Sequence, residues 1–439
     1  MNAVTVKAPP SKSLSHRALI GAALAAGESV VENVLESRDL ERTISILAAA
    51  GAGMARTAPG TYTVRGVSGV LRGGAGEPLS CDVHESGTTC RLLTAILATG
   101  RGRFRIHGAP RMHERPVGEL TAALEALGVH IAFEGRAGYP PFILDAAGIE
   151  GGEVGIGMDE SSQYLSGLLL AAPLTRFGLT VRIGGRHAVS WPYVGLTLQT
   201  LEDYGVAFEV ETLSAGGAWL PADWRNLRQV VPGAMRFRIA PGAYRAGRHT
   251  VEGDWSGAGY FLAAGAIGPR PVRVEGLRIG SLQGDRALLD ILGRMGAVIE
   301  SDGDSVTVSP APLSGIDVDM GDCPDLVPTV AVVAAFASGR TTIRNVAHLR
   351  IKESDRIAAP VQELGKAGIR GEELPDGLTI QGGVPHAASG TVFSAHGDHR
   401  MAMSLALLGL GGVHVELDDV TCVGKSFPSF WTLWEKVLP

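Results

Sequence analysis

The chain has 439 residues, 45% hydrophobic and 19% charged, a balance typical of folded globular proteins with room for two or three domains. Its formal net charge of -6 argues against a broad nucleic-acid surface, and no apolar run reaches the roughly 18 residues of a membrane-spanning helix. Four cysteines without disulfide spacing fit a reducing compartment, so we expect a cytoplasmic protein.

The first predicted helix covers the apolar run at residues 18–24 and follows the polar stretch Ser11-Lys12-Ser13. A helix N-terminus carries partial positive charge, so Lys12 and Arg17 each cost roughly 0.3–1 kcal/mol there unless an anion lies among them. These residues predict a phosphate or carboxylate ligand. The alternative is that both side chains extend into water.

Cations recur at the starts of two later segments. Gly87 and Arg91 stand near the start of an apolar helix, where a glycine lets backbone N–H groups approach an anion closely. Arg115 precedes a helix that we expect to start at Pro116. Both segments therefore repeat the pattern of the first helix.

The same pattern returns near the other end of the chain. Asp398 is predicted to cap a helix whose first turn contains His399 and Arg400, and Lys425 lies in a predicted turn. Because the whole chain is acidic, this clustering of cations is local and predicts small anionic ligands.

One sequence pattern occurs five times: a helical stretch ends in leucine, three residues follow, and a glycine precedes a β-prone stretch. Its recurrence predicts an α/β protein built from a multiplied unit of the order strand-helix-strand-helix-strand-strand. A sixth unit would have to borrow from the two ends of the chain. The five instances are Leu47 to Gly51, Leu124 to Gly128, Leu201 to Gly205, Leu292 to Gly296 and Leu364 to Gly368.

The longest interval between these glycines predicts a domain boundary at about residues 252–254. Each half then contains about three units. Ligand sites usually lie between domains, and the cationic motifs fall on both sides of the boundary. We therefore expect a cleft that closes on anions.

The densest polar run covers residues 348–356. If this run is helical, Lys352 and Arg356 stand one turn apart, where like charges repel unless an anion lies between them. Glu353 beside bound cations is a plausible proton donor or acceptor. The alternative is a solvated face of mixed charge, which Asp355 would complete.

Ser161, Ser162 and Gln163 precede another apolar helix. Capping alone explains them, but two hydroxyls and an amide also form a neutral phosphate cradle. Asp325 is likewise either a helix cap or a functional carboxylate, depending on its neighbours.

Metal and nucleotide sites have little support in the sequence. Cys81, His84 and Cys90 lack a fourth zinc ligand, and Cys90 falls inside a predicted helix. The segment ending in Lys425 differs from a P-loop because position 419 is Asp419 rather than glycine. We expect neither a metal nor a cofactor.

Seven motifs in order, spread over residues 11–428, resemble the EPSP synthase family of enolpyruvyl transferases. They are Ser-Lys-Ser-x-Ser-x-Arg, Ser-Gly-Thr-Thr, Arg-Met-x-Glu-Arg-Pro, Ser-Ser-Gln, Lys-Glu-Ser-Asp-Arg, Asp-His-Arg-Met-Ala and Lys-Ser-Phe-Pro. The resemblance implies an inverse α/β barrel fold of two similar domains, each with three βαβαββ units, and an active site in the interdomain cleft. One domain would comprise residues 12–252, and residues 1–11 would complete the other at 253–439.

The resemblance also implies an activity. The family transfers the enolpyruvyl group of phosphoenolpyruvate to the 5-hydroxyl of shikimate 3-phosphate and releases phosphate, without metal or cofactor. Asp325 would accept the hydroxyl proton, Glu353 would move a proton to and from the methylene carbon, and Lys12 would assist catalysis. We expect a monomer that binds these small molecules and neither nucleic acid nor membrane.

Two sets of binding residues follow from the same resemblance. Shikimate 3-phosphate would contact Lys12, Ser13, Arg17, Ser161, Ser162, Gln163, Ser190, Tyr193, Asp325 and Lys352. Phosphoenolpyruvate would contact Lys12, Gly87, Arg115, Gln163, Arg356, Arg400 and Lys425. Two positions depart from the family pattern: Glu85 and His348 stand where relatives often have asparagine.

Two alternative functions stay open at this point. A UDP-N-acetylglucosamine enolpyruvyl transferase shares the fold, but it would be expected to have Lys-Asn in place of Lys12-Ser13 and a reactive cysteine on a loop. A non-catalytic phosphometabolite sensor needs cations but no acid or base, so Asp325 and Glu353 disfavour it.

Overall fold

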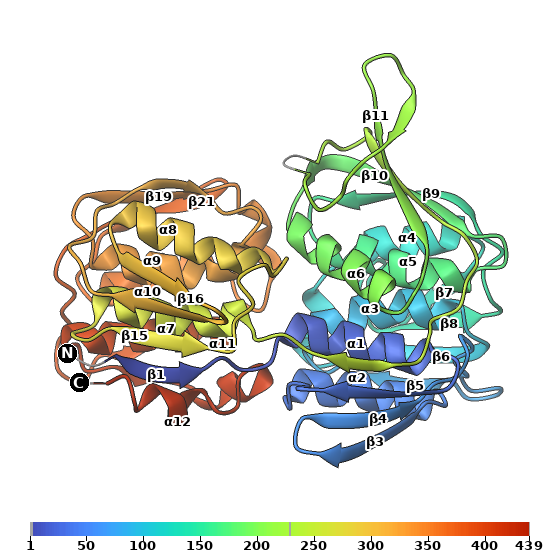
Figure 1. Cartoon of the computed structure of the whole chain (residues 1–439), viewed down its shortest axis with the longest axis horizontal. Coiled ribbons are helices and arrows are strands. Elements are labelled where there is room, and N and C mark those ends of the chain that lie inside the picture. The colour runs from blue at the N-terminus through green and yellow to red at the C-terminus, as the bar shows by residue number, and fades with distance from the viewer. Residues whose placement is uncertain (1–2, 228–229, 439) are drawn as a thin grey trace. The chain divides into compact units, whose positions relative to one another are not determined.

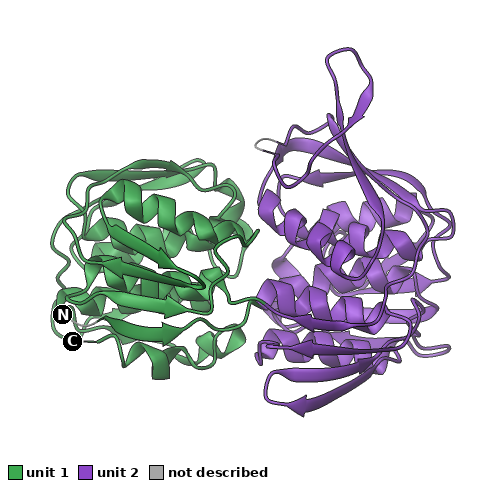
Figure 2. Ribbon diagram, in the orientation of Figure 1, with its two compact units in different colours: residues 1–11, 252–439 green, residues 12–251 purple. Residues whose placement is uncertain are grey.

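The computed structural model describes residues 3–227 and 230–438 and divides the chain into two compact units. Unit 1 comprises Met1–Ser11 and Glu252–Pro439, and unit 2 comprises Lys12–Val251 (Figure 2). Unit 2 therefore ends at Val251, one residue before the end at residue 252 that we expected from the sequence. Both units mix short helices with small sheets, which is the predicted α/β class (Figure 1).

The simplest repeat lies in the middle of unit 2. Its strands have the order β5-β6-β8-β7, in which β5 and β6 are parallel and β8 is antiparallel to both of its neighbours. This arrangement is the predicted βαβαββ unit. Its elements are β5 (Leu79–Asp82), α3 (Gly87–Ala98), β6 (Gly102–His107), α4 (Gly118–Ala126), β7 (His130–Phe133) and β8 (Phe142–Ala146).

The other two repeats of unit 2 vary this plan. The last repeat has the order β12-β11-β13-β10-β9, and the first has the order β14-β2-β4-β3, so its outer strand comes from the far end of the unit. The last contains β9 (Gly152–Met158), α5 (Gln163–Ala171), β10 (Leu179–Ala188), α6 (Trp191–Asp203), β11 (Phe208–Leu213), β12 (Trp219–Pro221) and β13 (Met235–Ile239). The first contains α1 (Lys12–Leu24), β2 (Glu28–Glu32), α2 (Arg38–Ala49), β3 (Gly53–Ala58), β4 (Thr61–Arg65) and β14 (Arg248–Thr250).

Unit 1 begins with a repeat that uses the start of the chain. Its sheet has the order β1-β15-β17-β16, and Val4 of β1 lies in parallel register with Val272 of β15 (Figure 1). The middle repeat has the order β18-β19-β21-β20. The elements are β1 (Val4–Lys7), α7 (Trp255–Ile267), β15 (Val272–Glu275), α8 (Leu288–Met295), β16 (Val298–Asp302), β17 (Ser305–Ser309), β18 (Asp317–Asp319), α9 (Val327–Ala335), β19 (Arg340–Arg344), α10 (Ala358–Lys366), β20 (Gly371–Leu374) and β21 (Gly377–Gln381).

The sixth repeat differs from the expectation that it would borrow from both ends of the chain. The strand at the start of the chain joins β15 instead, in the fourth repeat. Among the described residues, the sixth sheet has only two parallel strands, β22 and β23. Its elements are β22 (Val392–Phe393), α11 (His399–Leu405), β23 (Glu416–Leu417) and α12 (Phe430–Trp434).

The predicted helix endings are confirmed in all five cases. Each glycine adopts a positive φ, the left-handed conformation that ends a helix and that residues with a Cβ rarely tolerate. The φ values are 114° at Gly51, 89° at Gly128, 70° at Gly205, 112° at Gly296 and 73° at Gly368.

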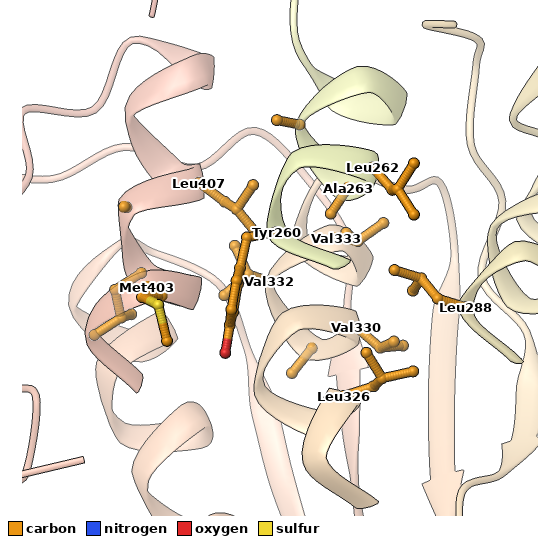
Figure 3. Packing of buried hydrophobic residues seen from close by; sticks show 14 of the residues in the cluster. Tyr260, Leu262, Ala263, Leu288, Leu326, Val330, Val332, Val333, Met403 and Leu407 are labelled. Atoms are coloured by element: carbon orange, nitrogen blue, oxygen red, sulfur yellow. The ribbon is translucent and has the colours of Figure 1, made fainter. Parts of the chain in front are cut away.

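The core of unit 1 forms where apolar helices pack together. Helix α7 is apolar on nearly all sides, as expected of a helix surrounded by protein, and it packs against α9, which in turn packs against α11. Tyr260 of α7 lies near Met403 and Leu407, and Val330 of α9 lies near Leu326 (Figure 3). Unit 1 thus has an apolar core built largely from its helices.

Across the described ranges, we find no helix with both the length and the apolar character needed to cross a membrane.

Candidate active site

Lys12 is the first residue of α1, as the sequence predicted for a cation at a helix start. In the structure the anion beside it belongs to the protein, because Lys12 Nζ lies 2.7 Å from Asp39 Oδ2, and the anionic ligand stays a prediction. Asp39 stands in the first turn of α2, where the helix dipole favours a carboxylate. Asp39 could not be identified from the sequence, because its pairing with Lys12 depends on tertiary structure.

Arg17 is buried in α1 and contacts two of the other predicted residues, Ser13 and Tyr193. Nε donates to Thr197 Oγ1 at 2.8 Å, Nη1 to the Ser13 carbonyl at 3.0 Å, and Nη2 to the Tyr193 carbonyl at 2.9 Å and to Ser166 Oγ at 3.4 Å. All of these acceptors are uncharged. Burial lowers the pKa of Arg17 to about 10, so it is still cationic at neutral pH.

The start of α3 gathers two guanidinium groups around Gly87. Ser86 caps the helix by accepting from the Thr89 N–H at 3.2 Å. A Cβ on Gly87 would lie 2.7 Å from both Arg91 Nη1 and Arg115 Nη2, so a larger residue would displace these guanidinium groups. The sequence predicted that this glycine lets backbone N–H groups approach an anion, and the two guanidinium groups beside it add positive charge at that place. The expected helix at Pro116 is wrong by two residues, because α4 starts at Gly118.

Gln163 is fixed at both ends of its amide. Oε1 accepts from Arg91 Nη1 at 3.0 Å, and Nε2 donates to Thr88 Oγ1 at 3.0 Å. Ser161 Oγ accepts from the Gln163 N–H at 3.2 Å, whereas the Ser162 side chain makes no capping bond. Ser162 therefore does not act as the predicted cap.

Ser190 and Tyr193 lie together at the start of α6. Ser190 is the residue before the helix and has φ of 58°, an uncommon conformation for a residue with a side chain. The Tyr193 N–H donates to the Ser190 carbonyl at 3.2 Å. Because Arg17 contacts the Tyr193 carbonyl, α6 and α1 present these residues on adjoining surfaces.

In unit 1, Asp325 is not the helix cap that the alternative interpretation allowed. It lies in a short 3-10 turn, Pro324–Leu326, and accepts from two arginines. Arg356 Nη1 lies 2.9 Å from Asp325 Oδ1, and Arg400 Nη2 lies 2.6 Å from Oδ2. The carboxylate keeps about a quarter of its surface accessible, with 24% exposed, so a ligand can approach it.

Arg356 is buried and has three carboxylate partners. Besides Asp325, it donates to Asp398 at 2.7 and 3.1 Å and to Glu353 Oε2 at 3.0 Å. Burial opposes its charge, but these carboxylates outweigh burial and raise its pKa above the ordinary value. Asp398 also caps α11 through the Arg400 N–H, as predicted, but its pairing with Arg356 was missed.

Glu353 and Lys425 form a second pair, with Lys425 Nζ 3.3 Å from Glu353 Oε1. Residues 352–356 are not helical, so the helix considered for this polar run does not form. A 3-10 helix, Ala347–Ile351, ends before Lys352, which is extended. The chain leaves the helical path there, and Arg356 is buried against its carboxylates. Lys352 and Arg356 are therefore not neighbours on one helix face.

The two departures from the family pattern have different environments. His348 is buried, and desolvation followed by the charge of Lys352 lowers its pKa to about 3, so it is neutral at physiological pH. Glu85 is half-buried, and its carbonyl accepts from Arg115 Nη1 at 3.1 Å. The backbone at position 85 therefore helps to hold the arginine beside Gly87.

Asp285 is a further carboxyl near Asp325 that sequence reasoning missed. It is buried and accepts from the Ser256 hydroxyl. Burial raises its pKa to about 7, and the charge of Asp325 adds to this effect. Within the described ranges, we find no group of three or more histidine, cysteine or acidic side chains arranged to hold a metal.

Comparison with known proteins identifies a family. The sequence profile of EPSP synthase (3-phosphoshikimate 1-carboxyvinyltransferase) matches residues 3–220 and 229–434. The 3-phosphoshikimate 1-carboxyvinyltransferase of Syntrophobacter fumaroxidans is 42% identical over 431 residues, which cover 98% of this chain and 96% of the relative. That of Marinomonas sp. (strain MWYL1) is 38% identical over 435 residues, with coverage of 98% and 96%. An EPSP synthase structure from Acinetobacter baumannii shares the fold, with a TM-score of 0.76 at 24% identity over 99% of this chain and 95% of that one.

Proposed function

Because this chain belongs to the EPSP synthase family, we propose that it transfers the enolpyruvyl group of phosphoenolpyruvate to the 5-hydroxyl of shikimate 3-phosphate. The products are 5-enolpyruvylshikimate 3-phosphate and inorganic phosphate, and the reaction belongs to the pathway to chorismate. The observation that carries this proposal is the arrangement of Asp325 and Glu353 among three cations in unit 1.

Asp325 acts as the general base for the 5-hydroxyl. Arg356 and Arg400 hold its two carboxylate oxygens in place, and its partly exposed carboxylate accepts the proton during attack. Glu353 donates a proton to the methylene carbon during addition and removes one during elimination. Contacts with Lys425 and Arg356 hold its carboxylate in place for both steps.

The reaction passes through a cationic state and then a tetrahedral intermediate. A carboxylate beside the reacting carbon stabilises the positive charge as well as moving a proton. Arg356, Arg400 and Lys425 bind the phosphate and carboxylate of phosphoenolpyruvate through charge-assisted hydrogen bonds. The phosphate departs as the enol ether forms.

Unit 2 supplies the other predicted substrate contacts. Arg17 and the hydroxyl groups around it bind the phosphate of shikimate 3-phosphate, because a buried arginine with uncharged partners favours an incoming anion. The remaining contacts to shikimate 3-phosphate come from Lys12, Ser13, Ser161, Ser162, Gln163, Ser190 and Tyr193, with Asp325 and Lys352 from unit 1. Lys12, Gly87, Arg115 and Gln163 also contact phosphoenolpyruvate.

We propose that the protein acts as a cytoplasmic monomer on these small molecules. Its four cysteines are free and buried, which suits a reducing compartment, and its net charge is -6. Light scattering after size-exclusion chromatography tests the monomer directly, with one 45.7 kDa species as the expected result.

The function is tested by phosphate release from phosphoenolpyruvate, with shikimate 3-phosphate or UDP-N-acetylglucosamine as acceptor. We expect turnover with shikimate 3-phosphate alone, and a decrease in kcat of about 10²–10⁴-fold for Asp325→Asn. Asp317→Asn, an exposed aspartate of the same unit, is the matched control and should retain full activity.

Turnover only with UDP-N-acetylglucosamine would assign the related transferase activity instead. Binding of shikimate 3-phosphate without turnover by the folded wild type would identify a sensor.

A further inference from the structure

We propose that Asp39 is a positioning residue that holds the Lys12 ammonium group in its reactive orientation. The inference rests on the proposed function, because it assigns Asp39 a part in the reaction to which Lys12 contributes. Asp39 does not touch substrate in this proposal. It acts through Lys12 and through the start of α3.

The contact between Asp39 and Lys12 is short and shielded from water. The two charged atoms lie 2.7 Å apart, and the side chains are only 6% and 16% exposed. By contrast, the neighbouring pair Arg42 and Asp82 is 40% exposed on both sides. Exposed pairs constrain their side chains weakly, whereas a shielded pair fixes the position of a flexible lysine.

The dipoles of the two helices act differently on Lys12 and Asp39. Lys12 is the first residue of α1, whose first turn contains no acidic residue, so the positive end of the helix disfavours the ammonium there. Asp39 lies in the first turn of α2, where the same effect favours a carboxylate. The pair therefore places the lysine where α1 alone would repel it.

Asp39 is also connected to the Gly87 segment. Its carbonyl accepts from Thr89 Oγ1 at 3.3 Å, and Thr89 Oγ1 lies 2.7 Å from the capping hydroxyl of Ser86. Thr43, one turn along α2, adds a 2.8 Å contact to Thr89 Oγ1. One aspartate thus ties Lys12 to the helix start that holds Gly87.

The charge of Asp39 determines which kinetic constant responds to its removal. A carboxylate beside an ammonium group competes with anionic substrates, so it does not strengthen their binding. Its contribution is orientation, and a misplacement of about 1 Å can cost about 100-fold in rate. Removing it should therefore lower kcat while KM changes little.

The experiment compares Asp39→Asn, Lys12→Ala and the double variant, with Glu41→Gln as the matched control. Glu41 is exposed in the same turn of α2 and loses the same charge. We expect Asp39→Asn to lower kcat by about 10- to 100-fold and to change the KM for phosphoenolpyruvate by less than about threefold. In the Lys12→Ala background the same change should cost less than about twofold.

Additive losses in the double variant would overturn the proposal, because Asp39 would then act independently of Lys12. Activity of Asp39→Asn equal to that of Glu41→Gln, or a raised KM with unchanged kcat, would overturn it as well. If Asp39→Asn fails to fold, Asp39→Glu retains the charge and should recover within about tenfold of wild-type kcat; a greater loss contradicts the proposal. An inactive wild type would contradict the proposed function itself. The coupling of Lys12 and Asp39 would then be measured by urea unfolding of the wild type, the two single variants and the double variant. Additive changes in the free energy of unfolding would overturn the pairing.

Discussion

The buried arginines of the two units are held by opposite kinds of partner. In unit 1, Arg356 contacts Asp325, Glu353 and Asp398, and these carboxylates raise its pKa despite burial. In unit 2, Arg17 contacts hydroxyl and carbonyl oxygens, and burial lowers its pKa. The same residue type is thus paired with carboxylates in one unit and with uncharged oxygen atoms in the other.

The largest expected effect is the loss of stability on removing the charge of Arg356. Arg356→Met leaves the fully buried Asp398 carboxylate without its main counter-charge, so we expect a loss of about 3–5 kcal/mol in the free energy of unfolding. Urea unfolding monitored by tryptophan fluorescence measures this loss. A change below about 1 kcal/mol would show that burial, not pairing, dominates in unit 1.

We expect Arg17→Met to weaken ligand binding and to have little effect on stability. The stability of the ligand-free protein should change by less than about 1 kcal/mol, because a desolvated charge is removed together with its hydrogen bonds. Binding of shikimate 3-phosphate should weaken by about 10- to 100-fold, as measured by calorimetry. If Arg17→Met were as destabilising as Arg356→Met, the contrast between the units would fail.

Gly87→Ala tests how firmly the guanidinium groups of unit 2 are held. The new methyl group would meet Arg91 and Arg115 at 2.7 Å and displace them, so we expect the KM for phosphoenolpyruvate to rise by about tenfold. Gly365 in α10 has open space around it, and Gly365→Ala should leave the KM unchanged. An unchanged KM in Gly87→Ala would mean that both arginines yield freely.

The last prediction concerns the pH dependence of stability, a property that the units share. Burial lowers the pKa of both His16 and His348 to about 3 in the folded protein, compared with 6.5 in the unfolded chain. Between these values the unfolded chain binds protons that the folded protein does not bind. Stability should fall as the pH drops from 6.5 toward 3, by about 1.4 kcal/mol per pH unit for each histidine.

His16→Asn and His348→Asn should therefore each flatten this pH dependence by the same amount, measured as urea midpoints at pH 7 and pH 5. Unequal slopes would show that the surrounding charges of the two units, rather than burial, control the histidines.

Features fixed by local chemistry were predicted from the sequence. The five glycines that end helices and the Asp398 cap are examples, because a positive φ or an unpaired helix N–H requires a particular residue type nearby. The α/β class and the repeated unit followed from these regularities. The family motifs then assigned the candidate site residues, whose roles in substrate binding and catalysis are still to be tested.

Pairings between distant segments could not be predicted in the same way. Asp39 follows Arg38 and resembles an ordinary acidic residue in a first helical turn, yet it meets Lys12. Asp398 has the sequence context of a cap, and nothing local indicates that it also binds Arg356. The run at residues 352–356 failed as a helix because burial of Arg356 among carboxylates outweighed local preference.

The parallel pairing of β1 with β15 has a consequence for biosynthesis. Val4 cannot pair with Val272 until Val272 has been synthesised, and the whole of unit 2 is translated in between. A nascent chain that ends before β15 can assemble the contiguous residues of unit 2, but its first strand still lacks the partner that its backbone groups require. The order of synthesis therefore sets the order in which the two units can be completed.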